Sequence, residues 1–363
     1  MQVSEDFTSD WFVAYMAERR GTPVTVEQFR RFTRGTSRQT WFVDYRAQNE
    51  SGLRSIVIRT DHPAGAGDPT PLDQEFALYE RLGRLNLATA RALFWEGDAG
   101  FCPRPFYLRE RVDGDWQVEG YGAAGDAGAR VRLETAREHM RALAAIHDAD
   151  WSAAGFAQIL GAPCGTDDVA QFYVGRQLDL HSRFGAEPQP LLLAVARFLR
   201  ETAPEAARIS LCKGTNGLGE EVFRDGRIVA LSDWEEAWIG DPASDLAMVQ
   251  GFTEAITLDG ETVWGLERAI DYYNSVAAVP VSLDNVRYYQ LARMFGRLVM
   301  FAFTTTVVRG SGEATVRQSW TATEVQHAVK RMMAGAMGIG QGPDPAVFEE
   351  LNQSVEMQAG EVT

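Results

Sequence analysis

The chain has 363 residues, of which 45% are hydrophobic and 23% are charged, as in an ordinary globular protein. This length suffices for one large two-lobed domain or for two smaller domains. The formal net charge of −15 repels nucleic acids and anionic lipid surfaces, so the sequence predicts neither a nucleic-acid partner nor a membrane partner. A local basic pocket for a phosphate group remains compatible with this charge.

The first residues and the cysteines favour a cytoplasmic protein. Residues 1–12 carry acidic side chains and lack the apolar segment of a signal peptide. The longest strongly apolar stretch, residues 298–308, contains three threonines and is too short to span a bilayer. Cys102, Cys164 and Cys212 have no metal-ligand spacing, and their odd number favours free thiols in a reducing compartment.

The first part of the chain combines short strands with two helices. An apolar stripe predicts a helix over residues 6–19, and a second helix is expected over residues 72–85. Gly35-Thr36-Ser37 predicts the turn between the first two strands of an antiparallel sheet. Runs of β-branched and aromatic residues place the strands at residues 29–32, 40–43, 55–58, 94–95 and 106–108.

The pattern changes near Asp113, where we place the boundary between an N-terminal lobe, residues 1–113, and a C-terminal lobe, residues 114–363. A Gly/Ala-rich loop is expected over residues 121–129, and Asp225-Gly226 predicts a hairpin turn between short strands. Helices are expected near residues 140–147, 168–181, 189–202 and 242–337. The pattern therefore predicts an α+β fold with a small sheet-rich lobe and a large, mostly helical lobe.

Two charged residues of the N-terminal lobe have the spacing of a phosphate anchor. Arg59 ends a strand, and Glu75 lies in the next helix, where it can orient the guanidinium by an ion pair. The alternative is two unrelated surface charges. Gly35, Thr36 and Ser37 can cover phosphates with backbone N–H groups and hydroxyls, although such residues are also common in ordinary turns.

Asp233 closes an apolar strand over residues 228–232. A carboxylate at the end of a buried strand is costly unless it is paired or binds a metal ion. Phosphoryl transfer needs a cation for the phosphates, carboxylates for a metal ion and an acceptor for the proton of the attacking hydroxyl. Asp233 is therefore a candidate metal ligand, with a capping role as the alternative.

Several segments together resemble the aminoglycoside phosphotransferase and choline kinase group, and within it the kinases associated with acyl-CoA dehydrogenases. These segments are RFTRGTSRQTWFVDY, VIRTDHPAG, DQEFALYERL, FYLRERVDG and LSDWEEAWIGDPASDLA. They resemble, in that order, the first hairpin, the phosphate-anchoring strand, the partner-glutamate helix, the hinge and the metal-binding segment. The resemblance implies a two-lobed protein-kinase-like fold that binds ATP or GTP with Mg²⁺ at a hinge near Glu110 and Val112. It also implies a small-molecule acceptor, with a hydroxyacyl-CoA thioester as one candidate.

One loop departs from the family pattern His-Gly-Asp-x-x-x-x-Asn. In that register the chain has Lys213 for the histidine, Thr215 for the catalytic aspartate and Glu220 for the metal-binding asparagine. Asp233 falls at the family's usual distance beyond the loop and is expected to hold Mg²⁺ together with Glu220. A threonine hydroxyl cannot accept a proton near neutral pH, which removes a contribution of about 10²–10⁴-fold to the rate.

The altered loop leaves several interpretations open. Lys213 can offset the charge of Glu220, stabilise the transferring phosphate or bind an anionic group of a substrate other than ATP. Glu221 is either a replacement base or a solvated strand residue, and we favour the second. The resulting hypotheses are a phosphotransferase acting on an alcohol, a pseudokinase that binds nucleotide or a metabolite, and a kinase-like cleft reused for different chemistry through Lys213 and Glu220.

The residues around the loop are expected to be mainly structural. The resemblance gives Asp245 the role of bracing the loop by hydrogen bonds. His147 lies on an apolar helix face and is expected to be a satisfied core residue. Cys212 is expected to be buried, with a pKa lowered by the lysine of the loop as the alternative. Trp234 and Trp238 flank the metal segment and can line a substrate cleft.

Overall fold

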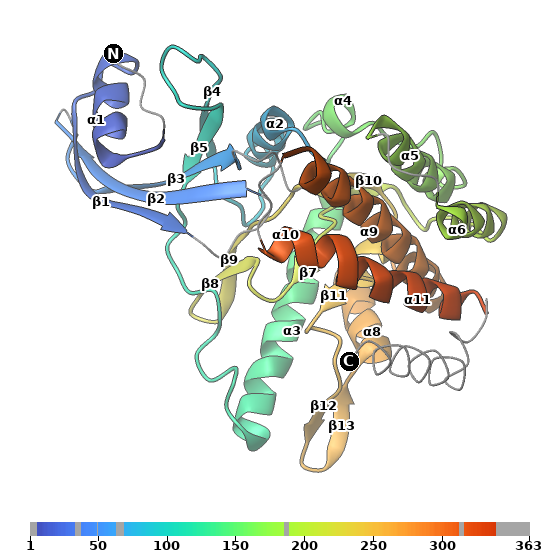
Figure 1. Ribbon diagram of the computed structural model, residues 1–363. Coiled ribbons are helices and arrows are strands. Elements are labelled where there is room, and N and C mark those ends of the chain that lie inside the picture. Colours follow the sequence, from blue (N-terminus) through green and yellow to red (C-terminus); the bar gives the residue numbers. More distant parts are fainter. Residues whose placement is uncertain are drawn as a thin grey trace, which may run out of the picture.

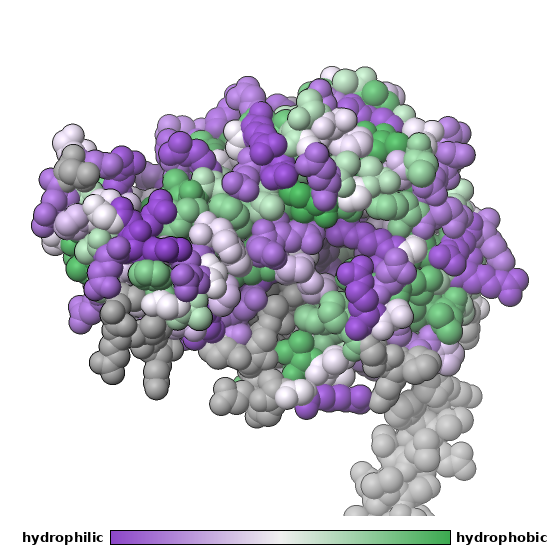
Figure 2. Space-filling model, turned by 90° about the horizontal axis from the view of Figure 1, so that it is seen from above, coloured by the Kyte–Doolittle hydropathy of each residue, from purple (hydrophilic) through white to green (hydrophobic). Residues whose placement is uncertain are grey.

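The computed structural model describes residues 6–32, 38–48, 50–62, 69–184, 189–311 and 316–338. A five-stranded antiparallel sheet with two helices forms one lobe, and helices with short hairpins form the other (Figure 1). Seen from above, most of the described surface is hydrophilic, with hydrophobic areas scattered between (Figure 2). The predicted α+β, two-lobed fold is confirmed.

Helix α1 (Ser9–Glu18) packs on the sheet of the first lobe. Its N-terminus is capped by Thr8, whose hydroxyl accepts a hydrogen bond from the backbone N–H of Trp11 at 3.1 Å. The rings of Trp11 and Tyr15 each lie 5.3 Å from the ring of Phe106 in the sheet. These aromatic contacts fasten the helix to the strands, and the predicted first helix is confirmed.

The sheet follows the predicted antiparallel order closely. Its strands are β1 (Val24–Phe32), β2 (Arg38–Ala47), β3 (Arg54–Asp61), β4 (Ala92–Glu96) and β5 (Phe106–Glu110). They are hydrogen-bonded in the order β1-β2-β3-β5-β4, and every pair is antiparallel. The register places Arg59 opposite Thr40 on β2 and Tyr107 on β5. The predicted turn at residues 35–37 lies outside the described residues.

Helix α2 (Leu72–Leu82) packs against β4 and β5, which confirms the helix predicted after the third strand. Leu72, Glu75, Leu78, Tyr79 and Leu82 are its buried residues, spaced as on one helical face. A glutamate on such a face needs partners, because an unpaired buried carboxylate is strongly unfavourable. Because the packing of α2 buries Glu75, a cation has to lie next to its carboxylate.

Helix α9 is the central helix of the second lobe, in contact with α5, α6, α7 and α11. By length and composition alone α9 could cross a membrane, but its packing and its buried Arg293 are those of a core helix. The helices of this lobe are α3 (Gly125–Asp148), α4 (Ala157–Leu160), α5 (Val169–Arg183), α6 (Pro190–Glu201), α7 (Ala243–Leu246), α8 (Leu266–Val276), α9 (Leu283–Ser311), α10 (Val316–Trp320), the π-helix η1 (Thr321–Val325) and α11 (Gln326–Ala336).

Short strands connect these helices and carry the candidate loop. They are β6 (Ser210–Cys212), β7 (Asn216–Gly217), β8 (Glu221–Arg224), β9 (Arg227–Leu231), β10 (Trp238–Gly240), β11 (Val249–Gln250), β12 (Ile256–Leu258) and β13 (Glu261–Trp264). The hairpin turn predicted at Asp225-Gly226 joins β8 to β9, with φ of 52° and 72° at its two central residues.

Two predictions about this lobe are wrong. The loop over residues 121–129 is shorter than expected, because α3 already begins at Gly125 and its alanines favour a helix. Residues 242–337 are not helical throughout, since β12 and β13 form a hairpin. Its turn is Asp259-Gly260, with φ of 50° and 82°, the same signal that identified the other hairpin. The apolar runs beside it are too short to stand out from the helical pattern.

Candidate functional site

The predicted pair of Arg59 and Glu75 forms. Arg59 Nη2 on β3 lies 2.9 Å from Glu75 Oε1 on α2, and the exposed fraction of the Arg59 side chain is 12%, compared with 1% for Glu75. Tyr107 donates a hydrogen bond to the same carboxylate at 2.8 Å. Arg59 Nη2 also lies 3.7 Å from Glu235 Oε2 in the second lobe. The guanidinium is therefore held in one orientation by groups from both lobes.

Arg38, the first residue of β2, completes this cluster and was missed by the sequence reasoning. Its side chain is fully buried, its Nε lies 2.6 Å from Glu75 Oε2, and it also pairs with Asp61. Burial raises the pKa of Glu75, but Arg59 and Arg38 outweigh burial and hold that pKa below its ordinary value. The strand register brings Arg38 to the same end of the sheet as Arg59. Pairing the two predicted strands in antiparallel order could therefore have identified Arg38 from the sequence.

The hinge residues lie where β5 ends. The backbone N–H of Glu110 donates to the carbonyl oxygen of Arg91 at 2.9 Å, and the two side chains form an ion pair of 2.7 Å. Val112 is partly buried against the core of the second lobe. Nucleotide binding at these residues remains a prediction, and Gly35, Thr36 and Ser37 lie outside the described residues.

The loop between β6 and β8 is held from behind by Asp245. The carboxylate of Asp245 accepts hydrogen bonds from the backbone N–H groups of Lys213 at 2.7 Å and Gly214 at 2.9 Å, as the resemblance implies. Gly214 has a φ of 90°, and a Cβ atom there would lie 2.3 Å from the carbonyl oxygen of Glu236. Backbone contacts therefore position the loop, and they do not depend on its unusual side chains.

Oxygen atoms enclose the ammonium group of Lys213. Its Nζ lies 2.5 Å from Glu220 Oε2 and 3.3 Å from the carbonyl oxygen of Asp233, and it also donates to the carbonyl oxygen of Thr215. These acceptors use all three donors of an ammonium group, and the side chain is fully buried. Burial lowers the pKa of Lys213, but Glu220 and Asp233 outweigh burial and hold that pKa above its ordinary value. The geometry supports the interpretation that Lys213 offsets the charge of Glu220.

Thr215 occupies the position of the family's catalytic aspartate but faces the backbone. Its hydroxyl donates a hydrogen bond of 2.6 Å to the carbonyl oxygen of Asp233. Burial raises the pKa of Glu220 to about 7, and the neighbouring Lys213 opposes that rise. The loop therefore has no carboxylate at the position from which the family's aspartate would accept the proton of an attacking hydroxyl.

Asp233 presents its carboxylate without a protein partner. Its φ of 64° is uncommon for a residue other than glycine. Within the described ranges the carboxylate has no hydrogen bond or ion pair, while the backbone oxygen receives those of Lys213 and Thr215. A partly buried carboxylate with no partner suits a Mg²⁺ ligand. Asp233 thus fits the role of holding one metal ion, whereas Glu220 can share it only through the oxygen that Lys213 leaves free.

One prediction about a neighbouring residue is wrong. Glu221 is not solvated, because its side chain is buried and its Oε1 lies 3.1 Å from His139 Nδ1. Cys212 is buried, as predicted, and burial raises the pKa of its thiol well above the ordinary value, so the alternative of a lowered pKa does not hold. His147 is a satisfied core residue, as predicted, with Nε2 3.1 Å from Asp245 Oδ2 and Nδ1 2.7 Å from a tyrosine hydroxyl. Although His147, Cys212 and Asp245 lie close enough to hold a metal ion, their existing partners and the protonated thiol indicate a structural cluster.

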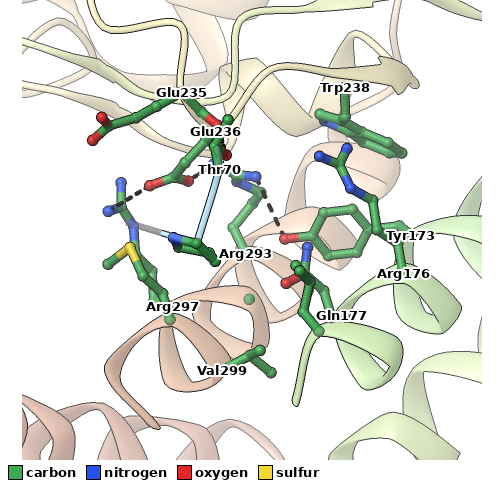
Figure 3. Close-up of a pocket in the computed structure, with 14 residues that line it drawn as sticks. Thr70, Tyr173, Arg176, Gln177, Glu235, Glu236, Trp238, Arg293, Arg297 and Val299 are labelled. Atoms are coloured by element: carbon green, nitrogen blue, oxygen red, sulfur yellow. Dashed lines mark hydrogen bonds and ion pairs between the residues drawn. The ribbon is translucent and has the colours of Figure 1, made fainter. Parts of the chain in front are cut away.

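A cavity of about 50 Å³ lies beside the metal segment, between α5, α9 and residues 69–70 and 235–238 (Figure 3). Trp238 lines this cavity, and its place in a substrate cleft remains a prediction. Trp234 does not line it, because its ring is fully buried and its N–H donates to the carbonyl oxygen of Leu231 at 3.0 Å. The two tryptophans therefore have different roles.

Arg293 joins this cavity to the loop. It is 4% exposed and donates to the carbonyl oxygen of Gly214 and to the carboxylate of Glu236, both at 2.7 Å. Burial lowers the pKa of Arg293, but Tyr173 and Glu236 outweigh burial and raise it. The sequence reasoning missed this residue, although an arginine within the apolar stretch of a long helix is the kind of signal that could have identified it.

The two lobes, the cation at the sheet and the braced loop define a kinase-like phosphotransferase architecture. A putative aminoglycoside phosphotransferase from Ralstonia eutropha has a similar structure, with a TM-score of 0.64, 17% identity and coverage of 93% of this chain and 100% of that chain. A macrolide 2′-phosphotransferase from Brachybacterium faecium has a TM-score of 0.53, 18% identity and coverage of 86% and 97%. At these identities the likeness shows the fold alone.

Sequence comparison then defines the family. The model of the phosphotransferase enzyme family matches residues 28–272, so the chain belongs to this family. Acyl-CoA dehydrogenase family member 11 of Rattus norvegicus is 26% identical over 239 residues, and its Mus musculus counterpart is 25% identical over the same length. These matches cover 63% of this chain and 28% of each relative, so the chain spans about 28% of the length of these curated relatives. The predicted resemblance is confirmed.

Proposed function

We propose that this protein transfers a phosphoryl group from ATP or GTP to a hydroxyl of a small molecule, with Mg²⁺ bound at Asp233. The proposal depends on the groups that would bind the nucleotide phosphates and the metal ion. Arg59 is oriented by Glu75 at 2.9 Å, and the carboxylate of Asp233 has no partner among the residues that the structure describes. Bound Mg²⁺ would neutralise charge on the nucleotide phosphates.

The transfer has to proceed without a carboxylate base in the loop. The acceptor oxygen forms a bond to the γ-phosphorus, the bond from that phosphorus to the bridging oxygen breaks, and the nucleoside diphosphate leaves with the electron pair. The hydroxyl proton goes to an oxygen of the transferred phosphoryl group, since the hydroxyl of Thr215 is no base and already donates a hydrogen bond to the backbone carbonyl oxygen of Asp233. Because positioning and charge stabilisation supply most of the catalysis in a loose transition state, such an enzyme is slow but not inactive.

The acceptor that we favour is a hydroxyacyl-CoA thioester. The support is the match of 239 residues to acyl-CoA dehydrogenase family member 11, whose name refers to acyl-CoA. The match covers 28% of that protein, so it bears on one part of it. The acceptor class is therefore tested directly below.

The second candidate is a pseudokinase that binds nucleotide without transfer. This candidate is favoured because oxygen atoms in and beside the loop already accept hydrogen bonds from the ammonium group of Lys213 and from the hydroxyl of Thr215. A third candidate, new chemistry through Lys213 and Glu220, fits the geometry less well. Lys213 is fully buried, so reaching a substrate would require breaking its ion pair with Glu220.

A thermal-shift titration with ATP, GTP and Mg²⁺, followed by turnover assays, separates these candidates. The proposed function predicts stabilisation by nucleotide with Mg²⁺ and slow formation of nucleoside diphosphate that depends on an alcohol from a panel including hydroxyacyl-CoA thioesters. Stabilisation without turnover across the panel would favour the pseudokinase. Failure of every nucleotide to stabilise the protein would reject both.

A further inference from the structure

The guanidinium group of Arg293 connects the loop between β6 and β8 to the segment that carries Asp233. One nitrogen atom, Nη2, donates both to the carbonyl oxygen of Gly214 and to the carboxylate of Glu236, each at 2.7 Å. Gly214 directly precedes Thr215 in the loop, and Glu236 lies three residues after Asp233. The two hydrogen atoms of a single nitrogen therefore link the two parts of the candidate site.

This contact complements the one that Asp245 makes with the same loop. The carboxylate of Asp245 accepts the backbone N–H groups of Lys213 and Gly214, at 2.7 Å and 2.9 Å, but an ionised carboxylate has no donor for a carbonyl oxygen. Arg293 supplies a donor for the carbonyl oxygen of the peptide bond between Gly214 and Thr215. The loop backbone is thus held through its N–H groups by an acceptor and through a carbonyl oxygen by a cation.

The packing of α9 against α5 sets the place of Arg293. Gly296, one turn further along α9, lies so close to Tyr173 on α5 that a Cβ atom there would lie 2.4 Å from the tyrosine oxygen. The same tyrosine oxygen accepts a hydrogen bond from Arg293 Nη1 at 3.4 Å (Figure 3), and 4% of the Arg293 side chain is exposed. A buried guanidinium with acceptors from three parts of the chain can fix the spacing between them.

Arg297, one turn further along the same helix, provides a matched comparison. Its Nη1 lies 2.8 Å from Oε1 of Glu236, whereas Arg293 contacts Oε2 of the same carboxylate. The Arg297 side chain is 27% exposed, and within the described residues it has no hydrogen bond or ion pair with the loop over residues 213–220. Both arginines therefore stabilise the charge of Glu236, but Arg293 also reaches the loop.

We propose that Arg293 is a positioning residue for phosphoryl transfer, which holds the loop at Gly214 against the segment that carries Asp233. This inference rests on the proposed function, in which the loop lies at the acceptor hydroxyl and Asp233 binds Mg²⁺. Arg293 acts through a backbone oxygen, so its effect does not depend on which side chains the loop carries. Because a misplacement of about 1 Å can lower a rate about 100-fold, losing this link should reduce kcat without weakening nucleotide binding at Arg59.

The test compares four forms of the full chain: the wild type, Arg293→Met, the double variant Arg293→Met with Glu236→Met, and the control Arg297→Met. The double variant removes both partners of the buried pair, which is tolerated better than the loss of one. Thermal unfolding checks that each protein is folded.

Three measurements are made on each folded protein. Release of ADP from ATP with Mg²⁺ and 3-hydroxybutyryl-CoA, as the acceptor probe, gives kcat. Calorimetric titration gives the Kd for ATP with Mg²⁺. Hydrogen–deuterium exchange, followed by mass spectrometry, reports on the backbone N–H groups of residues 213–221 and, for comparison, of β3.

In Arg293→Met and in the double variant, kcat should fall about 10- to 100-fold while the Kd for ATP with Mg²⁺ stays at the wild-type value. The loop should exchange about 10- to 100-fold faster, the effect expected from losing one hydrogen bond to a charged group, with no change in β3. Arg297→Met should keep the kcat and the loop exchange of the wild type, because Arg297 does not contact the loop.

Equal kcat and equal loop exchange in Arg293→Met and Arg297→Met would overturn the inference and leave the proposed function in place. Faster loop exchange with an unchanged kcat would also overturn it, since the contact would then serve stability alone. If Arg293→Met does not fold, the double variant decides by the same readouts. A wild type without turnover across the acceptor panel, with faster loop exchange in the variants, would reject the proposed function and keep the placement of the loop by Arg293.

Discussion

Two ion-pair clusters of this protein, one around Glu75 and one around Lys213, are built differently. Glu75 collects Arg59 and Arg38 from two strands and Tyr107 from a third, so the cluster is part of the frame of the sheet. Lys213 and Glu220 lie seven residues apart in one loop and neutralise each other at 2.5 Å. In the first cluster the side chain of Arg59 is 12% exposed, whereas in the second the side chain of Lys213 is fully buried.

Under the proposed function, the first cluster belongs to the phosphate-binding half of the site and the second to the half that would transfer a proton. The cluster that would bind phosphates holds Arg59 between Glu75 and Glu235. The loop that would move a proton has kept its backbone position through Asp245, but its charged groups bind one another instead of a substrate. The proposed function therefore combines phosphate binding at Arg59 with slow proton transfer at the loop.

The largest expected effect comes from restoring the family pattern in the loop. The triple variant Lys213→His, Thr215→Asp and Glu220→Asn should raise kcat by about 10²–10⁴-fold, the contribution of general-base catalysis. All three changes are needed together, because Glu220→Asn alone would leave the buried ammonium of Lys213 without its carboxylate. Steady-state release of nucleoside diphosphate measures the gain. A folded triple variant that binds ATP and is no faster than the parent would show that the loop does not limit the rate.

Breaking the buried ion pair of Lys213 and Glu220 should have the next largest effect, a loss of stability. Glu220→Gln removes the partner of a fully buried ammonium and should lower the free energy of unfolding by about 3 kcal/mol. The double variant with Lys213→Met should recover part of that loss, because no charge is then left buried. Urea denaturation at pH 7 measures both. Glu201→Gln is the matched control, since it breaks an exposed pair with Arg197 and should change stability by about 0.5 kcal/mol or less.

Removing Arg59, the partly exposed cation of the anchor, should weaken nucleotide binding with little effect on the loop. Arg59→Met should raise the Kd for ATP with Mg²⁺ by about 10- to 100-fold, because it removes charge-assisted hydrogen bonds to phosphate. Arg54→Met is the control on the same strand, where the arginine is 54% exposed and pairs with Glu50. Calorimetric titration gives both constants, and equal ATP affinity in the two variants would contradict the anchoring role.

The smallest expected effect is on the stability of the protein at acidic pH. Burial raises the pKa of Glu236, but Arg297 and Arg293 outweigh burial and hold it below the ordinary value of 4.5. A carboxyl with a lowered pKa contributes stability above pH 4.5 that is lost as the pH falls through its folded pKa. Below pH 4.5 the unfolding free energy of Glu236→Gln should therefore fall less steeply than that of the wild type, by up to about 1.4 kcal/mol per pH unit. Denaturation curves from pH 7 to pH 3.5 measure the slopes.

The control for this pH series is Glu201→Gln, whose carboxyl is 58% exposed. Its slope should match that of the wild type, because this carboxyl is exposed and its pair with Arg197 contributes little to stability. Parallel slopes for the wild type and Glu236→Gln would mean that the arginines do not stabilise the ionised form.

The local patterns of the chain were sufficient for the two lobes, the five strands of the sheet and the pair of Arg59 and Glu75, whereas the bracing role of Asp245 came from the family resemblance. These features depend on alternation, helical spacing and motif order, which are written along the chain. The hairpin at Asp259-Gly260 shows the limit of this reading, because its strands are too short for their alternation to outweigh the helical pattern around them.

Only the tertiary structure decided what the charged groups do. Arg38 reaches Glu75 through a strand register, Arg293 reaches Gly214 from a helix 79 residues further along the chain, and Glu221 is buried against His139. Whether a charge is free, paired or enclosed depends on neighbours that are distant in sequence, because desolvation and Coulomb attraction act through space. The sequence by itself thus determined that Lys213, Thr215 and Glu220 replace the usual residues. The folded structure decided that Lys213 binds Glu220 and the carbonyl oxygens of Thr215 and Asp233, and that the hydroxyl of Thr215 binds the same oxygen of Asp233.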